Sequence, residues 1–125
     1  MEIKILSHNE QPKLIAIEKE SWDKQTRIYK RKVHLVNTDG NKVLTIEDKQ
    51  LKTGDARLCL HGTETYVKCY EKYFMVERVS RTTTMSEQNS ASSFIAYDYN
   101  GKMLGKSRNL MTDNELFELA DKENY

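Results

Sequence analysis

The chain has little proline, little cysteine and no excess of charge of either sign. A single proline, Pro12, stands among 125 residues, which excludes proline-rich linkers, so we expect a single domain over residues 1–125. Two cysteines in a chain of this size indicate free thiols in the reducing cytoplasm rather than a disulfide framework. The net charge of +1 argues against a general polyanion-binding protein.

Long hydrophobic runs are also missing. No stretch approaches the length of a membrane-spanning helix, and the first residues lack the charged-then-apolar pattern of a signal peptide. With 38% hydrophobic and 31% charged residues, the chain can form one compact core beneath a strongly solvated surface. We therefore expect a cytoplasmic domain with no membrane partner.

What the chain does contain is a series of alternating apolar runs separated by turn dipeptides. Asp39-Gly40 lies between two such runs, residues 29–36 and 42–48, and favours a two-residue type I′ hairpin. The resulting register gives two apolar pairs on one face and two pairs of opposite charge. It places these residues opposite one another: Leu35 and Leu44, Val33 and Ile46, Val36 and Val43, His34 and Thr45, Arg31 and Asp48, Lys32 and Glu47.

Further hairpins follow the same logic. Asn100-Gly101, between runs 94–99 and 102–108, predicts a two-residue turn that pairs Ala96 with Gly105 and Tyr97 with Leu104. Gly62 lies between two short β-prone runs and predicts another hairpin. Residues 73–84 are rich in β-branched and aromatic side chains and predict one long strand.

The last segment predicts a helix. Thr112 and Glu115 have the spacing of a capping box, and Met111 and Leu116 can form the hydrophobic staple around it. Leu119 extends the apolar stripe, which must dock on the sheet because so short a helix is unstable alone. We therefore expect a mainly β, β-rich α+β fold: an antiparallel curled sheet or small β-barrel of about eight strands built from hairpins, with one C-terminal α-helix.

Two segments are candidates for contact with another protein. The Ser/Thr-rich segment 80–93 carries almost no charge, and its residues 86–93 predict a loop on a rigid sheet, where binding residues are often found. The end of the chain is acidic and could present a negative surface to a basic partner. The candidate residues are Thr82, Thr83, Thr84, Met85, Gln88 and Asn89 in the first segment, with Glu118 and Asp121 in the second.

A basic strand is the alternative site. Positive charge around an aromatic ring suits a nucleic-acid backbone with a stacked base, and the segment Arg27–Lys32 offers both. Cross-strand pairing with carboxylates accounts for part of this charge. The residues of this alternative are Arg27, Tyr29, Lys30, Arg31 and Lys32.

Metal chemistry has weaker support. Cys59, His61 and Cys69 could converge on zinc, but a fourth ligand is not visible and the spacing differs from true zinc motifs. The trio Asp39, Glu47 and Lys49 loosely resembles the arrangement in metal-dependent nucleases, yet a hairpin turn would hold the aspartate roughly 20 Å from the glutamate. We expect no metal, no cofactor and no catalytic residues.

These observations favour a non-enzymatic intracellular binding module that acts by protein–protein contact. Its size and chemistry fit a small inhibitor or immunity-type protein of a mobile element. A nucleic-acid-binding protein that uses Arg27–Lys32 is the alternative, and a small metal-dependent hydrolase is the third possibility.

Overall fold

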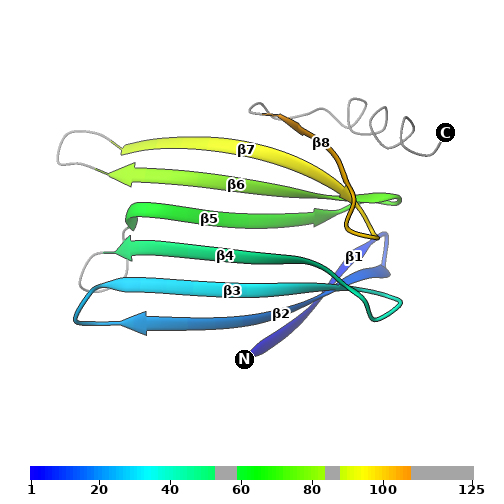
Figure 1. Ribbon diagram of the computed structural model, residues 1–125, viewed down its shortest axis with the longest axis horizontal. Coiled ribbons are helices and arrows are strands. Elements are labelled where there is room, and N and C mark those ends of the chain that lie inside the picture. Colours follow the sequence, from blue (N-terminus) through cyan, green and yellow to red (C-terminus); the bar gives the residue numbers. More distant parts are fainter. Residues whose placement is uncertain (53–58, 84–87, 108–125) are drawn as a thin grey trace.

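The computed structural model describes residues 1–52, 59–83 and 88–107. They form one sheet of eight antiparallel strands in chain order, each hydrogen-bonded to the next (Figure 1). The strands are β1 (Glu2–His8), β2 (Gln11–Asp23), β3 (Ile28–Asn37), β4 (Lys42–Lys52), β5 (Cys59–Cys69), β6 (Tyr73–Thr83), β7 (Gln88–Asp98) and β8 (Met103–Ser107). The prediction of a mainly β fold with about eight antiparallel strands is confirmed.

The sheet is not closed, so the β-barrel variant of the prediction is wrong. No helix in the part of the chain that the structure describes has the length and apolar character that crossing a membrane requires. The expected C-terminal helix, with its cap at Thr112, lies outside the described residues.

The larger of two apolar clusters lies between β2–β4 and β5–β6 of the curled sheet. The second cluster comprises Tyr70, Tyr73, Met75, Phe94 and Ala96. Strand alternation puts one set of side chains from β2, β3 and β4 on the same face, and residues of β5 and β6 pack against them. We call this the core face and the opposite side of β1–β4 the outer face. The buried core residues are Leu14, Ala16, Val33, Leu35, Ile46, Cys69, Phe74 and Val76.

The β3–β4 hairpin confirms the predicted register along most of its length. Val33 faces Ile46 and Leu35 faces Leu44. The turn itself differs, because Gly40 N–H donates to Asn37 O and Asn37 N–H to Asn41 O, which closes a three-residue loop. Gly40 alone takes the left-handed conformation, at φ 85°, as in a type I turn followed by a glycine bulge.

The register correction is confined to the end of this hairpin. The ladder shifts between Leu35 and Val36, so Val36 pairs with Lys42 and not with Val43. The signal missed in the sequence is Asn37, whose side-chain oxygen accepts hydrogen bonds from the N–H groups of Asp39 and Asn41 at 3.0 Å each. An Asx residue at the first turn position therefore selects the longer loop.

The turn of the β7–β8 hairpin has the same geometry. Asp98 accepts from the N–H groups of Asn100 and Lys102 at 2.9 Å each, and Gly101 has φ 90°. The predicted pair Ala96 and Gly105 is confirmed. Tyr97 pairs with Met103 instead of Leu104, since the shift lies between Ala96 and Tyr97.

The two turns contact each other and hold one end of the molecule together. Asn37 is buried, and its amide donates to Tyr99 O at 2.8 Å. A Cβ on Gly101 would lie 2.7 Å from the carbonyl oxygen of Val43. Only a glycine at this position allows the β7–β8 turn to approach the start of β4 so closely.

Two sequence-based assignments are wrong in β5 to β7. Gly62 does not form a hairpin, because β5 runs through it as one strand and the next turn joins Tyr70 to Tyr73. The long strand predicted over residues 73–84 is confirmed, because β6 spans Tyr73–Thr83, but the loop predicted over residues 86–93 is wrong where the structure describes it, because β7 begins at Gln88. Small polar residues are tolerated there because each pairs across the β6–β7 ladder.

Gly62 allows β5 to leave β4, and its replacement should destabilise the fold. It has φ 151°, and a Cβ would lie 2.3 Å from Lys49 O and 2.6 Å from Gln50 Cα. We expect Gly62→Ala to lower the free energy of unfolding by about 2–4 kcal/mol, because it combines backbone strain with overpacking. Urea denaturation measures this.

Gly40→Ala is the matched control. Gly40 has φ +85° but open space around its Cβ position, so only backbone strain of about 1–2 kcal/mol is expected there. If both variants lose the same stability, the close approach at Gly62 has no energetic importance.

Candidate functional site

The core face changes from apolar to ionic toward the β2–β3 turn. Glu18 follows Leu14 and Ala16 on the core face of β2, and Arg31 and Asp48 continue the same face on β3 and β4. Arg31 lies between the two carboxylates. Its NH2 group donates to Glu18 Oε1, and its NH1 group lies 3.3 Å from Asp48 Oδ2.

This ionic cluster is buried. The side chains of Glu18 and Asp48 are 4% and 1% exposed, and that of Arg31 is 21% exposed. Lys4 Nζ lies 3.3 Å from Glu18 Oε2 and supplies a second cation. Carboxylates withdrawn from water need such compensation, since breaking one partner of a buried pair is strongly destabilising.

Burial and pairing act in opposite directions on Glu18 and Arg31. Burial alone would raise the pKa of Glu18, but the hydrogen bond and charge of Arg31, with help from Lys4, lower that pKa below its ordinary value. Burial would likewise lower the pKa of Arg31, and the pairing with Glu18 and Asp48 raises it instead. Both groups are therefore held in their charged forms.

The ionic cluster also joins β4 to β5. The backbone ladder between these strands covers only Gln50, Leu51 and Lys52, and side chains make the connection beyond it. Asp48 Oδ2 accepts from Thr65 N–H at 2.9 Å, and Asp48 Oδ1 accepts from Thr65 Oγ1 at 2.7 Å and from Thr63 Oγ1 at 3.2 Å.

Three further side chains bind backbone carbonyls across the same gap. Gln50 Nε2 donates to Thr63 O at 2.8 Å, and Arg31 NH1 donates to Thr65 O at 3.1 Å. Arg78 NH2 on β6 donates to Glu47 O at 3.0 Å. We call the set Arg31, Asp48, Gln50 and Arg78 the β4–β5 seam. It satisfies backbone groups that would otherwise be buried without partners.

The outer face above this cluster is basic. Lys19 on β2 is directly opposite Lys32 on β3, and Lys30 on β3 is directly opposite Lys49 on β4. All four side chains are exposed. Like charges placed directly opposite one another on a sheet are destabilising, so these pairs do not serve the fold.

Little negative charge from the described residues offsets this patch. Lys32 Nζ lies 3.4 Å from Glu47 Oε1, but both groups are exposed, and such pairs contribute little. Lys19, Lys30 and Lys49 form no ion pair with another described residue. We call Lys19, Lys30, Lys32 and Lys49 the lysine patch.

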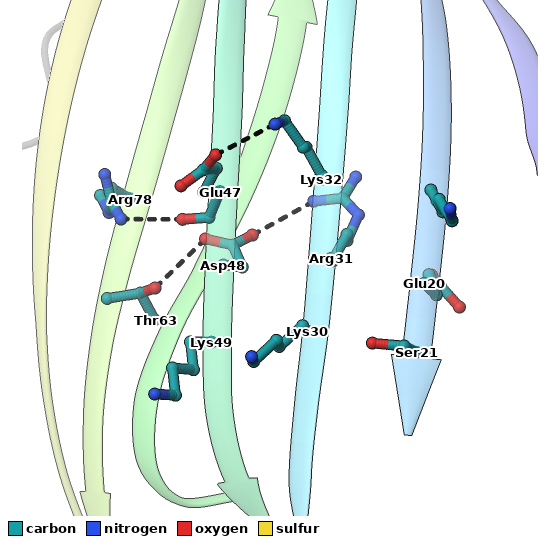
Figure 2. Close-up of a pocket in the computed structure, with 11 residues that line it drawn as sticks. Glu20, Ser21, Lys30, Arg31, Lys32, Glu47, Asp48, Lys49, Thr63 and Arg78 are labelled. Carbon is teal, nitrogen blue, oxygen red and sulfur yellow. Dashed lines mark hydrogen bonds and ion pairs between the residues drawn. The ribbon is translucent and has the colours of Figure 1, made fainter. Parts of the chain in front are cut away.

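A concavity of about 510 Å³ lies where the lysine patch meets the β4–β5 seam. Figure 2 shows Lys30 and Lys49 on neighbouring strands at one side of it and Arg78 at the other. Arg31, Asp48 and Thr63 line it from within the seam (Figure 2). The concavity is thus bordered by hydrogen-bonded residues of the seam and by exposed charged side chains, which include Glu20 and Glu47 besides the lysines.

The outer face continues into an apolar region at the β1 edge. Ile3 is paired with Ile17 and Ile5 with Ile15, so four isoleucines lie together. Ile3, Ile5 and Ile15 are 62%, 65% and 37% exposed. We call these four residues the isoleucine patch. Exposed apolar groups of this kind mark interaction surfaces.

The predicted basic strand is divided between two faces. Lys30 and Lys32 belong to the lysine patch, whereas Arg31 and Tyr29 point to the core face. Arg31 is committed to the seam, and the Tyr29 ring lies under Lys52 Nζ at 4.6 Å. Arg27 is in the β2–β3 turn, with φ 59°. Tyr29 therefore cannot stack a base beside Lys30 and Lys32.

Of the predicted protein-contact residues, the four that the structure describes lie together at one end of the β6–β7 ladder. Thr82 pairs with Asn89 and Thr83 with Gln88, at the end of the β6–β7 ladder, so these are strand residues and not loop residues. Thr82 and Asn89 are exposed. Thr84, Met85, Glu118 and Asp121 lie outside the described residues.

The weaker metal candidates are dispersed. His61 Nδ1 lies 3.4 Å from Thr82 Oγ1 at one end of β5, and Cys69 is buried in the core at the other end. Burial raises the pKa of the Cys69 thiol. Asp39 belongs to the β3–β4 turn, while Glu47 lies well within β4. Among the described residues, no group of three or more His, Cys, Asp or Glu side chains could hold a metal ion.

Sequence reasoning missed the most informative residues of the site. Glu18 had a visible signal, because a lone carboxylate continues the face of Leu14 and Ala16, and a charge on a buried face needs a partner. The Lys19 and Lys32 pair had none, since the β2–β3 register is not marked by a turn dipeptide.

Comparison of the chain with known proteins adds no relative. No protein-family model matches it, no curated protein matches it, and no solved structure matches it.

Removing the charge of Glu18 should change how stability depends on pH. The folded-state pKa of Glu18 lies below its ordinary value of 4.5. Its ionised form therefore contributes stability that is complete above that value and is lost as the pH falls through the lower folded pKa. We expect Glu18→Gln to lose about 1–3 kcal/mol near neutral pH and to show a shallower acid dependence than the unmodified protein.

Melting temperatures measured from neutral pH down to about pH 3 test this prediction. Glu47→Gln is the matched control, because the Glu47 side chain is 71% exposed. Equal acid slopes for the unmodified protein and Glu18→Gln would contradict a structural role for the ionised carboxylate.

Proposed function

We propose that the protein is a non-enzymatic binding module that contacts another protein through the outer face of β1–β4. The observation that carries this proposal is the presence of the isoleucine patch and the lysine patch on one continuous face. Ile17 and Lys19 are successive outward residues of β2, so the two patches adjoin.

The chemistry of the face indicates the chemistry of its partner. Protein interfaces combine a desolvated apolar centre with a polar, charged rim. The isoleucines can form the apolar centre, and the lysines can form the charged rim. The complementary partner surface is an apolar patch bordered by carboxylates. A small inhibitor or immunity-type protein of a mobile element would bind its target in this way.

The groups beneath the concavity support binding rather than catalysis. Asp48 accepts hydrogen bonds from Arg31, Thr63 and Thr65, so its carboxylate is committed to the seam. Glu47 pairs with Lys32, and its backbone carbonyl accepts from Arg78. The hydrogen-bonded carboxylate of Asp48 holds the scaffold, and the exposed lysines are the groups presented to a ligand.

Nucleic-acid binding is the second candidate, and the opposed lysine pairs favour it. Two such pairs form a local concentration of positive charge that suits phosphates. The adjoining isoleucines have no use in that role, and Tyr29 is on the other face. Binding to a protein accounts for both patches, so it is the favoured proposal.

Charge reversal in the lysine patch should abolish partner capture. We expect the double variant Lys30→Glu, Lys49→Glu to retain at least tenfold less of a specific partner than the unmodified protein in quantitative pull-downs from the source cells. Two adjacent charges would change from attraction to repulsion at the interface. Its melting temperature should stay close to that of the unmodified protein, because one opposed pair of like charges is replaced by another at the same two positions.

The matched control is Lys72→Glu, Lys106→Glu. Both residues are exposed and lie away from the outer face of β1–β4, so partner capture should be unchanged. Equal loss of the partner in both double variants would reject the lysine patch as the interface. The unmodified protein could instead bind DNA or RNA with an affinity that falls steeply with salt and is lost only in Lys30→Glu, Lys49→Glu. That result would favour a nucleic acid over a protein as the partner.

A further inference from the structure

Among the residues that the structure describes, strand β1 is the first strand of the sheet and is paired on one side only, by β2. Its end near His8 is covered, because the His8 ring lies 6.3 Å from the Tyr70 ring and His8 Nε2 lies 3.9 Å from Glu71 Oε2. Over residues 1–5, no other described strand is hydrogen-bonded to this edge. Unpaired backbone groups at such an edge are a template for another strand.

The features that usually protect an edge strand are few here. Residues 1–5 contain no proline, and the ladder irregularity of β1 lies later, between Leu6 and Ser7. Two of the outward side chains are the exposed Ile3 and Ile5. The other side carries Glu2 and Lys4, which are charges of opposite sign two positions apart. Charged side chains on an edge strand prevent pairing with a second copy of the chain only where two charges of the same sign face each other.

A symmetry argument selects one register for pairing with a second copy. When a two-fold axis perpendicular to the sheet relates two antiparallel strands, opposed residues must point to the same face. If Ile3 faces Ile3 of the copy, Glu2 faces Lys4 of the copy and Lys4 faces its Glu2. If the centre of the pairing moves to residue 2, Glu2 faces Glu2 of the copy. If it moves to residue 4, Lys4 faces Lys4 of the copy. Of these three registers, only the central one is free of like-charge pairs. A register centred on Ile5 would need residues 6–8, where His8 already lies against Tyr70 and Glu71.

We propose that two copies of this chain associate by antiparallel pairing of their β1 strands, with Ile3 opposite Ile3 and two reciprocal Glu2–Lys4 pairs. The two sheets then become one continuous sheet. The isoleucine patches of both copies adjoin on its outer face, which roughly doubles that apolar surface. This inference depends on the edge strand alone and stands whether or not the proposed partner binding is correct.

Charge variants with complementary partners test the register. Glu2→Lys places lysine at both positions, and Lys4→Glu places glutamate at both. In each variant alone, every reciprocal pair becomes repulsive, so we expect the dimer dissociation constant to rise about tenfold or more. In an equimolar mixture of the two variants, every cross-strand pair is again of opposite charge, and dimers should return as heterodimers.

Analytical ultracentrifugation over a concentration series gives the mass, and a tag on one variant identifies heterodimers. Lys4 also pairs with Glu18, so thermal melting of Lys4→Glu checks its fold, and Glu2→Lys provides a variant that leaves the Glu18 pair intact. Lys72→Glu is the control and should dimerise like the unmodified protein.

Three results would overturn the proposal. The unmodified protein could be monomeric at every concentration. Dimers could persist in both charge variants, which would exclude the β1 register. Dimers could also be lost in Ile15→Glu while remaining in Glu2→Lys and Lys4→Glu, which would assign the contact to the isoleucine face and not to the strand edge.

Discussion

The Arg31–Asp48 pair is the interaction on which the rest of the structure depends. Asp48 provides hydrogen-bond acceptors to Thr63 and Thr65, and Arg31 donates to Thr65 O. These bonds replace a ladder that ends when β5 turns away from β4 at Gly62. Without them, the first and second halves of the sheet could not face each other, because the backbone groups between β4 and β5 would be buried unpaired. Glu18 completes the cluster together with Lys4, so that two carboxylates face two cations.

Contacts between two turns stabilise the opposite end of the molecule. There the β3–β4 and β7–β8 turns share one geometry, with Asn37 or Asp98 capping the loop and a glycine in the left-handed conformation. The amide of Asn37 then joins one turn to the other through Tyr99 O. The core is thus bounded by polar contacts at both ends: ion pairs at the seam and side-chain caps of the turn backbone at the other end. Between them the apolar side chains pack without any strand needing to close the sheet into a barrel.

This arrangement also decides which cations remain available. Arg31 and Lys32 are neighbours in sequence, yet strand alternation places Arg31 in the buried cluster and Lys32 on the outer face. The guanidinium of Arg31, which can donate hydrogen bonds to two carboxylates, stabilises the fold, and the lysines carry the surface charge. The result is an outer face on which Lys32 pairs with Glu47, while Lys19, Lys30 and Lys49 form no ion pair with another described residue. That surface, and the β1 edge beside it, are where the proposed contacts are made.

The sequence by itself determined the strand content, the antiparallel hairpins and most of the β3–β4 register, because side-chain alternation and turn glycines act over short distances. It predicted the Arg31–Asp48 and Lys32–Glu47 pairs correctly for the same reason. Only the tertiary structure decided that Gly62 bends a continuous strand, that Glu18 joins Arg31, and that Lys19 and Lys49 flank the same patch. These depend on registers between strands that no turn dipeptide marks, and on the direction in which the sheet curls. A curl is set by packing across the core, which contacts between neighbours in sequence do not encode.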